Sequence, residues 1–166
     1  MKAPLFYSKI LLFGEYGIIE DSKGLSIPFN FFKGGLRIGD MSELIEKESN
    51  LNLKKFRDYL LKIEISTVEF DFEKLNLDLD KGMFFDSSIP QGYGVGSSGA
   101  LVAAFYDRYA INKITVLENL TKSKILVLKN IFSTMESFFH GKSSGLDPLN
   151  SYLSLPILIH SKNEVE

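Results

Sequence analysis

The sequence has no cysteine and only two histidines, His140 and His160, in 166 residues. The missing cysteines exclude disulfides, thiolate zinc sites and a cysteine nucleophile. Two histidines argue against a histidine-based metal site. Basic charge is not in excess either, because the net charge is -2, so no nucleic-acid partner is expected. Lys9 and Glu15 interrupt the apolar N-terminus, which predicts a cytoplasmic protein with no membrane partner.

What is present is typical of a globular protein, with 45% hydrophobic and 24% charged residues. The length fits one domain, or two small ones. Apolar runs and polar–apolar alternation predict strands in the first half of the chain, at residues 5–13, 16–20, 24–38, 62–72 and 83–85. Residues 24–38 are expected to be one or two strands, with breaks at Pro28 and at Gly34-Gly35. Residues 41–60 predict a helix in two pieces, with Asn50 near the break.

The second half of the chain is predicted to be mainly helical. Helices are expected over residues 98–109 and 115–139, the second stretch as one or two helices, followed by a polar loop, a further short helix and a strand at 156–160. An apolar stripe along the second helix is interpreted as core, and it consists of Ile125, Leu128, Phe132, Met135 and Phe139. Strands followed by helices predict an α+β fold, with a mostly antiparallel sheet packed with helices.

A glycine-rich loop, IPQGYGVGSSGA, occupies residues 89–100. Gly94 to Gly99 fit the G-x-G-x-x-G pattern of dinucleotide sites, but Pro90 and its polar neighbours argue against the buried strand which that reading requires. The glycines can instead turn several N–H groups inward as an anion nest at a helix N-terminus. Ser97 or Ser98 is expected to cap that helix. A glycine turn with a serine cap and no ligand is the alternative.

Three motifs, in this order, resemble those of the GHMP kinases (galactokinase, homoserine kinase, mevalonate kinase and phosphomevalonate kinase). IPQGYGVGSSGA resembles P-x-x-x-G-L-G-S-S-A-A, SKILLFGEY resembles G-K-[IV]-x-L-x-G-E-H, and ESFFHGKSSGLDP resembles the mevalonate kinase segment containing H-G-x-[PS]-S-G-x-D. Val95 replaces a leucine and Gly99 an alanine, and both departures are expected to be mild. The mevalonate kinases are the nearest match.

The resemblance covers nearly the whole chain, and it implies that residues 1–166 are the N-terminal ATP-binding and catalytic domain of such a kinase. It also implies an unusual left-handed β-α-β crossover. The third family motif, from the C-terminal domain, is absent, so we expect this chain to be the N-terminal half of a longer kinase. An apolar face left without that domain could drive self-association into a homodimer.

The resemblance implies ATP and Mg²⁺ as cofactors, and it assigns roles to individual residues. The phosphates would be bound by the loop residues Gly92, Gly94, Val95, Gly96, Ser97 and Ser98. Ser98 and Glu136 would also hold the metal, and Asp147 would be the catalytic aspartate, which Pro148 biases toward an extended backbone. Lys9, in an apolar strand, is expected to pair with Asp147 at the mouth of the loop.

The substrate would be a small molecule, contacted by Glu15, Tyr16 and Ser144. Tyr16 stands where the family usually has histidine, and His140 is expected to be structural, through hydrogen bonds of its side chain. The implied reaction is ATP-dependent phosphorylation of mevalonate to 5-phosphomevalonate, a step of isoprenoid precursor synthesis. The alternatives are a related kinase acting on a sugar, phosphomevalonate or a homoserine-like alcohol, and an inactive fragment or binding module that keeps the fold.

Overall fold

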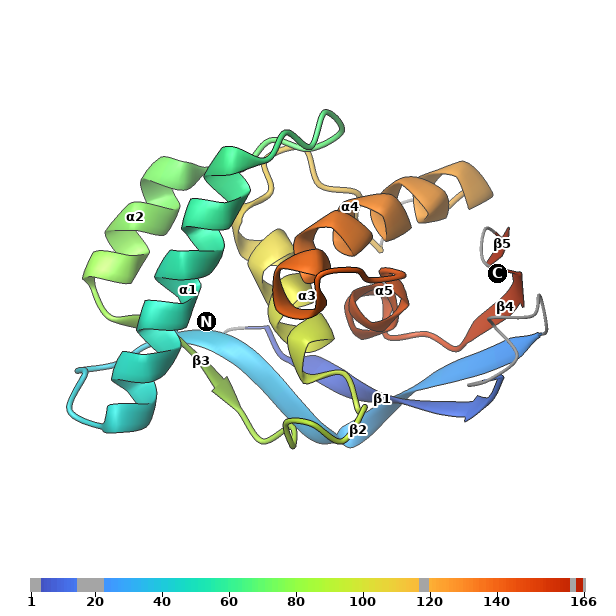
Figure 1. Cartoon of the computed structure of the whole chain (residues 1–166), viewed down its shortest axis with the longest axis horizontal. Coiled ribbons are helices and arrows are strands. Elements are labelled where there is room, and N and C mark those ends of the chain that lie inside the picture. Colours follow the sequence, from blue (N-terminus) through green and yellow to red (C-terminus); the bar gives the residue numbers. More distant parts are fainter. Residues whose placement is uncertain (1–3, 15–22, 117–119, 162–163, 166) are drawn as a thin grey trace.

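A computed structural model describes residues 4–14, 23–116, 120–161 and 164–165. Figure 1 shows a twisted sheet on one side of the molecule with the helices gathered over one of its faces. The strands are β1 (Phe6–Phe13), β2 (Gly24–Ile38), β3 (Met83–Ser87), β4 (Ile157–Ser161) and β5 (Glu164–Val165). The helices are α1 (Leu44–Lys62), α2 (Phe72–Asp80), α3 (Ser97–Tyr109), α4 (Lys122–His140) and α5 (Leu146–Leu153).

The long strand β2 organises the sheet. Its Gly34 pairs with Phe6 of β1 and also with Ser87 of β3, so β1 and β3 lie on opposite sides of β2. Strand β4 pairs with the other end of β2, and β5 pairs with β4. Every strand pairing in the described residues is antiparallel, which confirms the predicted α+β class. The handedness of the connection from β3 to β4 stays a prediction.

Helix α3 lies at the centre of the helical layer, where it contacts α4, α5 and the sheet. Ala100, Ala103 and Ala104 are buried along it, and their small side chains allow neighbouring elements to approach closely. Aromatic side chains fill the space around α3, with Phe105 packed edge-to-face on Phe56 at 4.9 Å. The apolar stripe of α4 is confirmed as core, since Leu128, Phe132 and Met135 are fully buried and Ile125 and Phe139 pack against them. The helix that follows the glycine loop is therefore anchored in the core.

Three predicted breaks, at Pro28, at Gly34-Gly35 and near Asn50, are wrong. Residues 24–38 form one continuous strand, in which Pro28 lies opposite Lys9 of β1. Gly34 does not interrupt this strand, because its missing side chain makes room for the ring of Phe85, 2.4 Å from where a Cβ would lie. Helix α1 is also continuous, because the side chain of Asn50 turns inward and donates to the main-chain oxygens of Leu79 and Met83.

The strand predicted over residues 62–72 is also wrong. Helix α1 extends to Lys62, α2 begins at Phe72, and only Phe70 makes an isolated bridge, with Ala110. The alternation in this segment arises because apolar side chains of the connection between α1 and α2 pack on the core, with Val68 buried and Ile65 and Phe70 partly buried. Helix α4 begins later than predicted, at Lys122, where the Thr121 hydroxyl caps it. The strand predicted at 16–20 lies outside the described residues, and none of the described helices is long and apolar enough to cross a membrane.

Candidate active site

The glycine loop joins β3 to α3 and presents unpaired N–H groups. Gly92, Gly94 and Gly96 have φ angles of 80°, 69° and 84°, which favour glycine. A Cβ added at Gly92 or Gly94 would meet no atom within 4 Å, so the loop borders open space. Within the described part of the chain, no backbone N–H from Gly92 to Ser98 donates to a protein acceptor. These donors at a helix N-terminus suit an anion.

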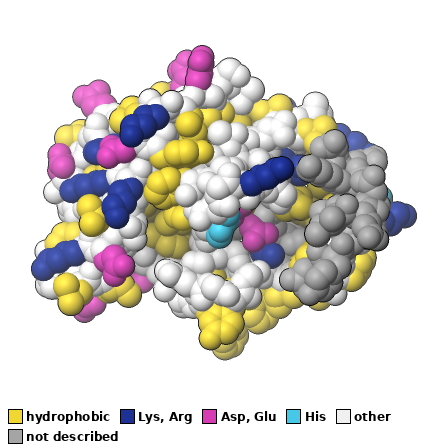
Figure 2. Space-filling model, viewed as in Figure 1, with side chains coloured by type: hydrophobic (Ala, Val, Ile, Leu, Met, Phe, Trp, Pro, Cys, Tyr) yellow, Lys and Arg dark blue, Asp and Glu magenta, His cyan; other side chains and the backbone are white. Residues whose placement is uncertain are grey.

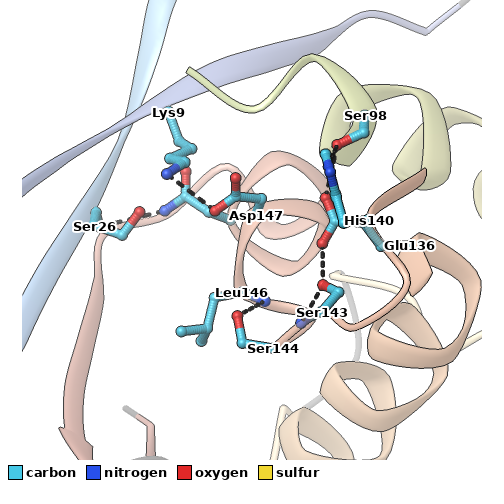
Figure 3. A network of polar contacts seen from close by, with 11 residues as sticks. Lys9, Ser26, Ser98, Glu136, His140, Ser143, Ser144, Leu146 and Asp147 are labelled. Atoms are coloured by element: carbon cyan, nitrogen blue, oxygen red, sulfur yellow. Dashed lines mark hydrogen bonds and ion pairs between the residues drawn. The ribbon is translucent and has the colours of Figure 1, made fainter. Parts of the chain in front are cut away.

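The prediction that a serine caps α3 is wrong. The cap is Gly96, in a left-handed conformation, and it makes no side-chain cap hydrogen bond. The Ser98 hydroxyl instead turns toward α4, where it donates to Oε1 of Glu136 at 3.0 Å and lies 2.9 Å from Nε2 of His140 (Figure 3). This arrangement leaves the first N–H groups of α3 without a cap, and it ties the start of α3 to the end of α4.

Glu136 is a carboxylate buried on the last turns of α4, with 3% of its surface exposed. It accepts hydrogen bonds from the hydroxyls of Ser98 and Ser143. Burial raises the pKa of Glu136, and the negative charge of Asp147 raises it further, while the two serine hydroxyls oppose the rise. A buried carboxylate with a raised pKa is a group whose charge a cation would stabilise.

Lys9 and Asp147 form an ion pair beside the loop, as predicted. Nζ of Lys9 lies 3.0 Å from Oδ1 of Asp147, and the two side chains are 12% and 33% exposed. The main-chain N–H of Lys9 donates to the oxygen of Val95 at 3.0 Å, which holds β1 against the loop. A Cβ built on Gly96 would lie 3.1 Å from Cγ of Lys9 and 3.8 Å from Oδ2 of Asp147. The pair therefore lies at the point where the loop enters α3.

The extended backbone predicted for Asp147 is wrong. Helix α5 begins at Leu146 after Gly145, so Asp147 lies in its first turn and Pro148 follows it within the helix. Proline is tolerated here because first-turn N–H groups have no acceptor within the helix. The helix therefore fixes the backbone that carries the Asp147 carboxylate.

The contact between α3 and α5 depends on Gly99. A Cβ at this position would lie 2.7 Å from the carbonyl carbon of Asp147 and 2.8 Å from the nitrogen of Pro148. Both distances are too short for carbon and main-chain atoms, so the replacement of the family alanine by Gly99 is not mild in this structure. The glycine lets the start of α3 approach the helix turn that carries Asp147.

Of the three residues predicted to contact the substrate, the structure describes only Ser144. Ser144 is exposed, and its hydroxyl accepts from the main-chain N–H of Leu146 at 3.3 Å. Glu15 and Tyr16 lie outside the described residues. The contact from Ser143 to Glu136 (Figure 3) was not predicted, because it depends on the turn after α4, which begins at Gly141.

The loop side of the site is open, since a Cβ at Gly92 or Gly94 would meet no atom within 4 Å. Figure 2 shows a histidine, acidic side chains and a basic side chain gathered near the middle of this face. Two hollows, of about 400 and 790 Å³, lie elsewhere, and Leu36 and Arg108 line both. Arg108 is near the opposite end of α3 from Ser97, so neither hollow belongs to this site.

The oxygens of Ser98 and Glu136 fit a magnesium site that is completed by phosphates. No group of three or more histidine, cysteine, aspartate or glutamate side chains in the described ranges could hold a metal ion. Mg²⁺ does not need such a group, because it keeps several waters and is commonly bound by one or two carboxylates together with substrate phosphates. The hydroxyl and the carboxylate lie side by side next to the unpaired amides of the loop.

Comparison with known protein families identifies the family of the chain. The sequence model of the GHMP kinases N terminal domain matches residues 53–154, and the chain belongs to this family. A search of curated protein sequences finds no match.

Solved mevalonate kinases share the fold. They include the Leishmania (L. major) enzyme in complex with R-mevalonate, at 18% identity and a TM-score of 0.53, covering 100% of this chain and 52% of that one. The Methanococcus jannaschii enzyme has 17% identity and a TM-score of 0.54, covering 99% and 55%. The enzyme of Staphylococcus aureus MRSA252 has 21% identity and a TM-score of 0.50, covering 98% and 53%. The chain spans about half the length of these solved kinases.

Proposed function

We propose that this chain, residues 1–166, forms the nucleotide-binding and catalytic domain of an ATP-dependent small-molecule kinase. The observation that carries the proposal is the pair of Lys9 and Asp147 beside a loop of unpaired amides. We propose mevalonate as the acceptor and 5-phosphomevalonate as the product. The similar structures support this choice, because they are mevalonate kinases and one of them holds R-mevalonate.

The N–H groups from Gly92 to Ser98 would bind the terminal phosphates of ATP, with the positive end of the α3 dipole behind them. Ser98 and Glu136 would hold Mg²⁺. The metal, when bound, neutralises charge on the phosphates. The chain's own contribution here is to fix the triphosphate in one orientation at the start of α3.

Asp147 would act on the acceptor hydroxyl. Lys9 occupies Oδ1 of Asp147, whereas Oδ2 faces Gly96 and has no protein partner among the described residues. The hydroxyl oxygen of the substrate forms a bond to the γ-phosphorus, the bond from that phosphorus to the oxygen of ADP breaks, and Oδ2 accepts the hydroxyl proton. Lys9 keeps the carboxylate in place, and its charge lies close to the transferring group.

The acceptor pocket would include Glu15, Tyr16 and Ser144. Ser144 lies on the exposed loop that leads into α5, three residues before Asp147. A substrate that reaches Oδ2 of Asp147 would therefore pass close to this loop.

A substrate panel tests the proposal. We expect ATP consumption with mevalonate, and none with a sugar, phosphomevalonate or homoserine. Asp147→Ala should lower turnover by about 10²–10⁴-fold, the range of general base catalysis, while ATP binding is retained. Asp86→Ala is the matched control, because Asp86 is also paired, with Arg37, but lies away from the site. Magnesium-dependent ATP binding with no turnover on any alcohol would instead favour the binding module.

A further inference from the structure

Ser98 has two side-chain partners, and only one of them has a role in the proposed function. Its Oγ lies 3.0 Å from Oε1 of Glu136 and 2.9 Å from Nε2 of His140. His140 is the last residue of α4, and it is exposed although its ring reaches Ser98. Figure 3 shows His140 and Glu136 next to each other beside Ser98.

The hydrogen-bond inventory decides which atom donates. A serine hydroxyl has one hydrogen and two lone pairs. The hydrogen of Ser98 is donated to Glu136, so the contact with His140 requires a hydrogen on Nε2 that is donated to Oγ. One lone pair of Oγ is then occupied by His140, and one remains for a cation.

We infer that His140 is a positioning residue for the metal ligand Ser98. The carboxylate of Glu136 fixes the direction of the Ser98 proton, and the N–H of His140 occupies one lone pair of the same hydroxyl. The remaining lone pair of Ser98 therefore points in one fixed direction. Without His140, the hydroxyl keeps only its bond to Glu136 and can rotate about it. The inference rests on the proposed function, because it assigns His140 to the same magnesium and nucleotide site.

A purely structural role for His140 makes a different prediction. The ring of His140 lies 6.4 Å from that of Phe139, so it could simply cover the end of α4. Loss of such a cover would lower the free energy of unfolding. It would not change the ratio between ATP affinity with magnesium and ATP affinity without it.

Two substitutions of His140 distinguish the positioning role from the structural role, because they place the side-chain N–H donor at different distances from the backbone. The amide nitrogen of a glutamine can reach the position of Nε2, whereas the shorter asparagine reaches only about as far as Nδ1. His140→Gln should therefore preserve the hydrogen bond to Ser98, and His140→Asn should remove it. His160→Gln is the matched control, since it makes the same change at the other histidine of the chain.

The measurement is calorimetric titration of ATP into each protein, with magnesium and with a chelator. We expect His140→Asn to reduce the gain in affinity due to magnesium by about 3- to 10-fold, which is the contribution of one hydrogen bond. His140→Gln and His160→Gln should keep the gain within about twofold of that of the unchanged protein. Thermal melts establish that each variant is folded.

A double-mutant cycle with Ser98→Ala adds an independent test. If His140 acts through Ser98, then His140→Asn should have no further effect on the magnesium-dependent gain once the hydroxyl is removed. Additive effects would overturn the inference, and so would an unchanged gain in His140→Asn or an equal loss in His140→Gln. If the unchanged protein itself shows no magnesium-dependent ATP binding, the proposed function fails before the role of His140 is tested.

Discussion

Replacing Gly99 with alanine should lower stability and turnover together. The added Cβ would lie 2.7 Å from the carbonyl carbon of Asp147, whereas carbon atoms in contact are separated by about 3.5–4.0 Å. Helices α3 and α5 must then move apart by about 1 Å. Overpacking of this kind costs about 1–3 kcal/mol, and the helix propensity of alanine over glycine returns about 1 kcal/mol. We therefore expect a net loss of about 1 kcal/mol in the free energy of unfolding, and at most about 2 kcal/mol.

The same movement displaces the proposed catalytic carboxylate. A misplacement of about 1 Å can cost about 10²-fold in rate, so we expect turnover to fall by at least about 10-fold while ATP affinity changes by less than about twofold. Urea unfolding measures the stability, steady-state kinetics the turnover and calorimetry the affinity. Gly99→Ser, with its larger side chain, should be worse in both stability and turnover. An alanine variant with the stability and turnover of the unchanged protein would refute the close contact and its role.

Three further predictions concern buried polar groups. In urea unfolding, the double variant Lys9→Met, Asp147→Asn should be more stable than Asp147→Asn alone by about 1 kcal/mol. The reason is that Lys9→Met removes a mostly buried ammonium group that Asp147→Asn leaves without its counter-charge. Equal stability of the double and the single variant would contradict the pairing. With metal chelated, the free energy of unfolding of Glu136→Gln should exceed that of the unchanged protein by an amount that grows as the pH rises above 4.5. The raised pKa means that the native state holds the proton of Glu136 more tightly than the unfolded state does, so the unchanged protein loses stability as that proton leaves. Parallel pH profiles of the two proteins would argue against burial of the charge. Asn50→Leu should lower the free energy of unfolding by about 1–3 kcal/mol, because it removes the two hydrogen bonds that the buried Asn50 amide donates to the carbonyls of Leu79 and Met83, and an unchanged urea midpoint would rule out that role.

The parts of the site that could be predicted from the sequence are those whose chemistry is visible in single residues. A lysine in an apolar strand needs a counter-charge, which pointed to an acid near Lys9, and the motif resemblance named Asp147. Glycines in close succession predicted a loop that turns N–H groups inward, and Gly92, Gly94 and Gly96 have the positive φ angles that such a loop needs. These predictions depend on local conformation or on one strong pair, so they need little knowledge of the packing.

The parts that could not be predicted depend on contacts between distant segments. Asn50 suggested a break in α1 because nothing near it in the sequence reveals the carbonyls of Leu79 and Met83. Ser98 suggested a helix cap because serine at a helix start usually caps, but here the partners on α4 take its hydroxyl. Gly99 looked like a mild replacement because the helix that approaches it begins 47 residues later, and only the fold brings them together.

The charges of the site show how metal and nucleotide binding should be coupled. Lys9 supplies one positive charge, and Glu136 and Asp147 supply two negative charges when both are ionised, so these side chains alone repel a triphosphate. The unpaired amides and the dipole of α3 attract it, but they carry only partial charges. Burial is the main cause of the raised pKa of Glu136, and the negative charge of Asp147 adds to it, although two serine hydroxyls donate to the carboxylate. A divalent cation between the carboxylate and the phosphates would relieve both repulsions, so by linkage ATP should raise the affinity for magnesium by the same factor by which magnesium raises the affinity for ATP.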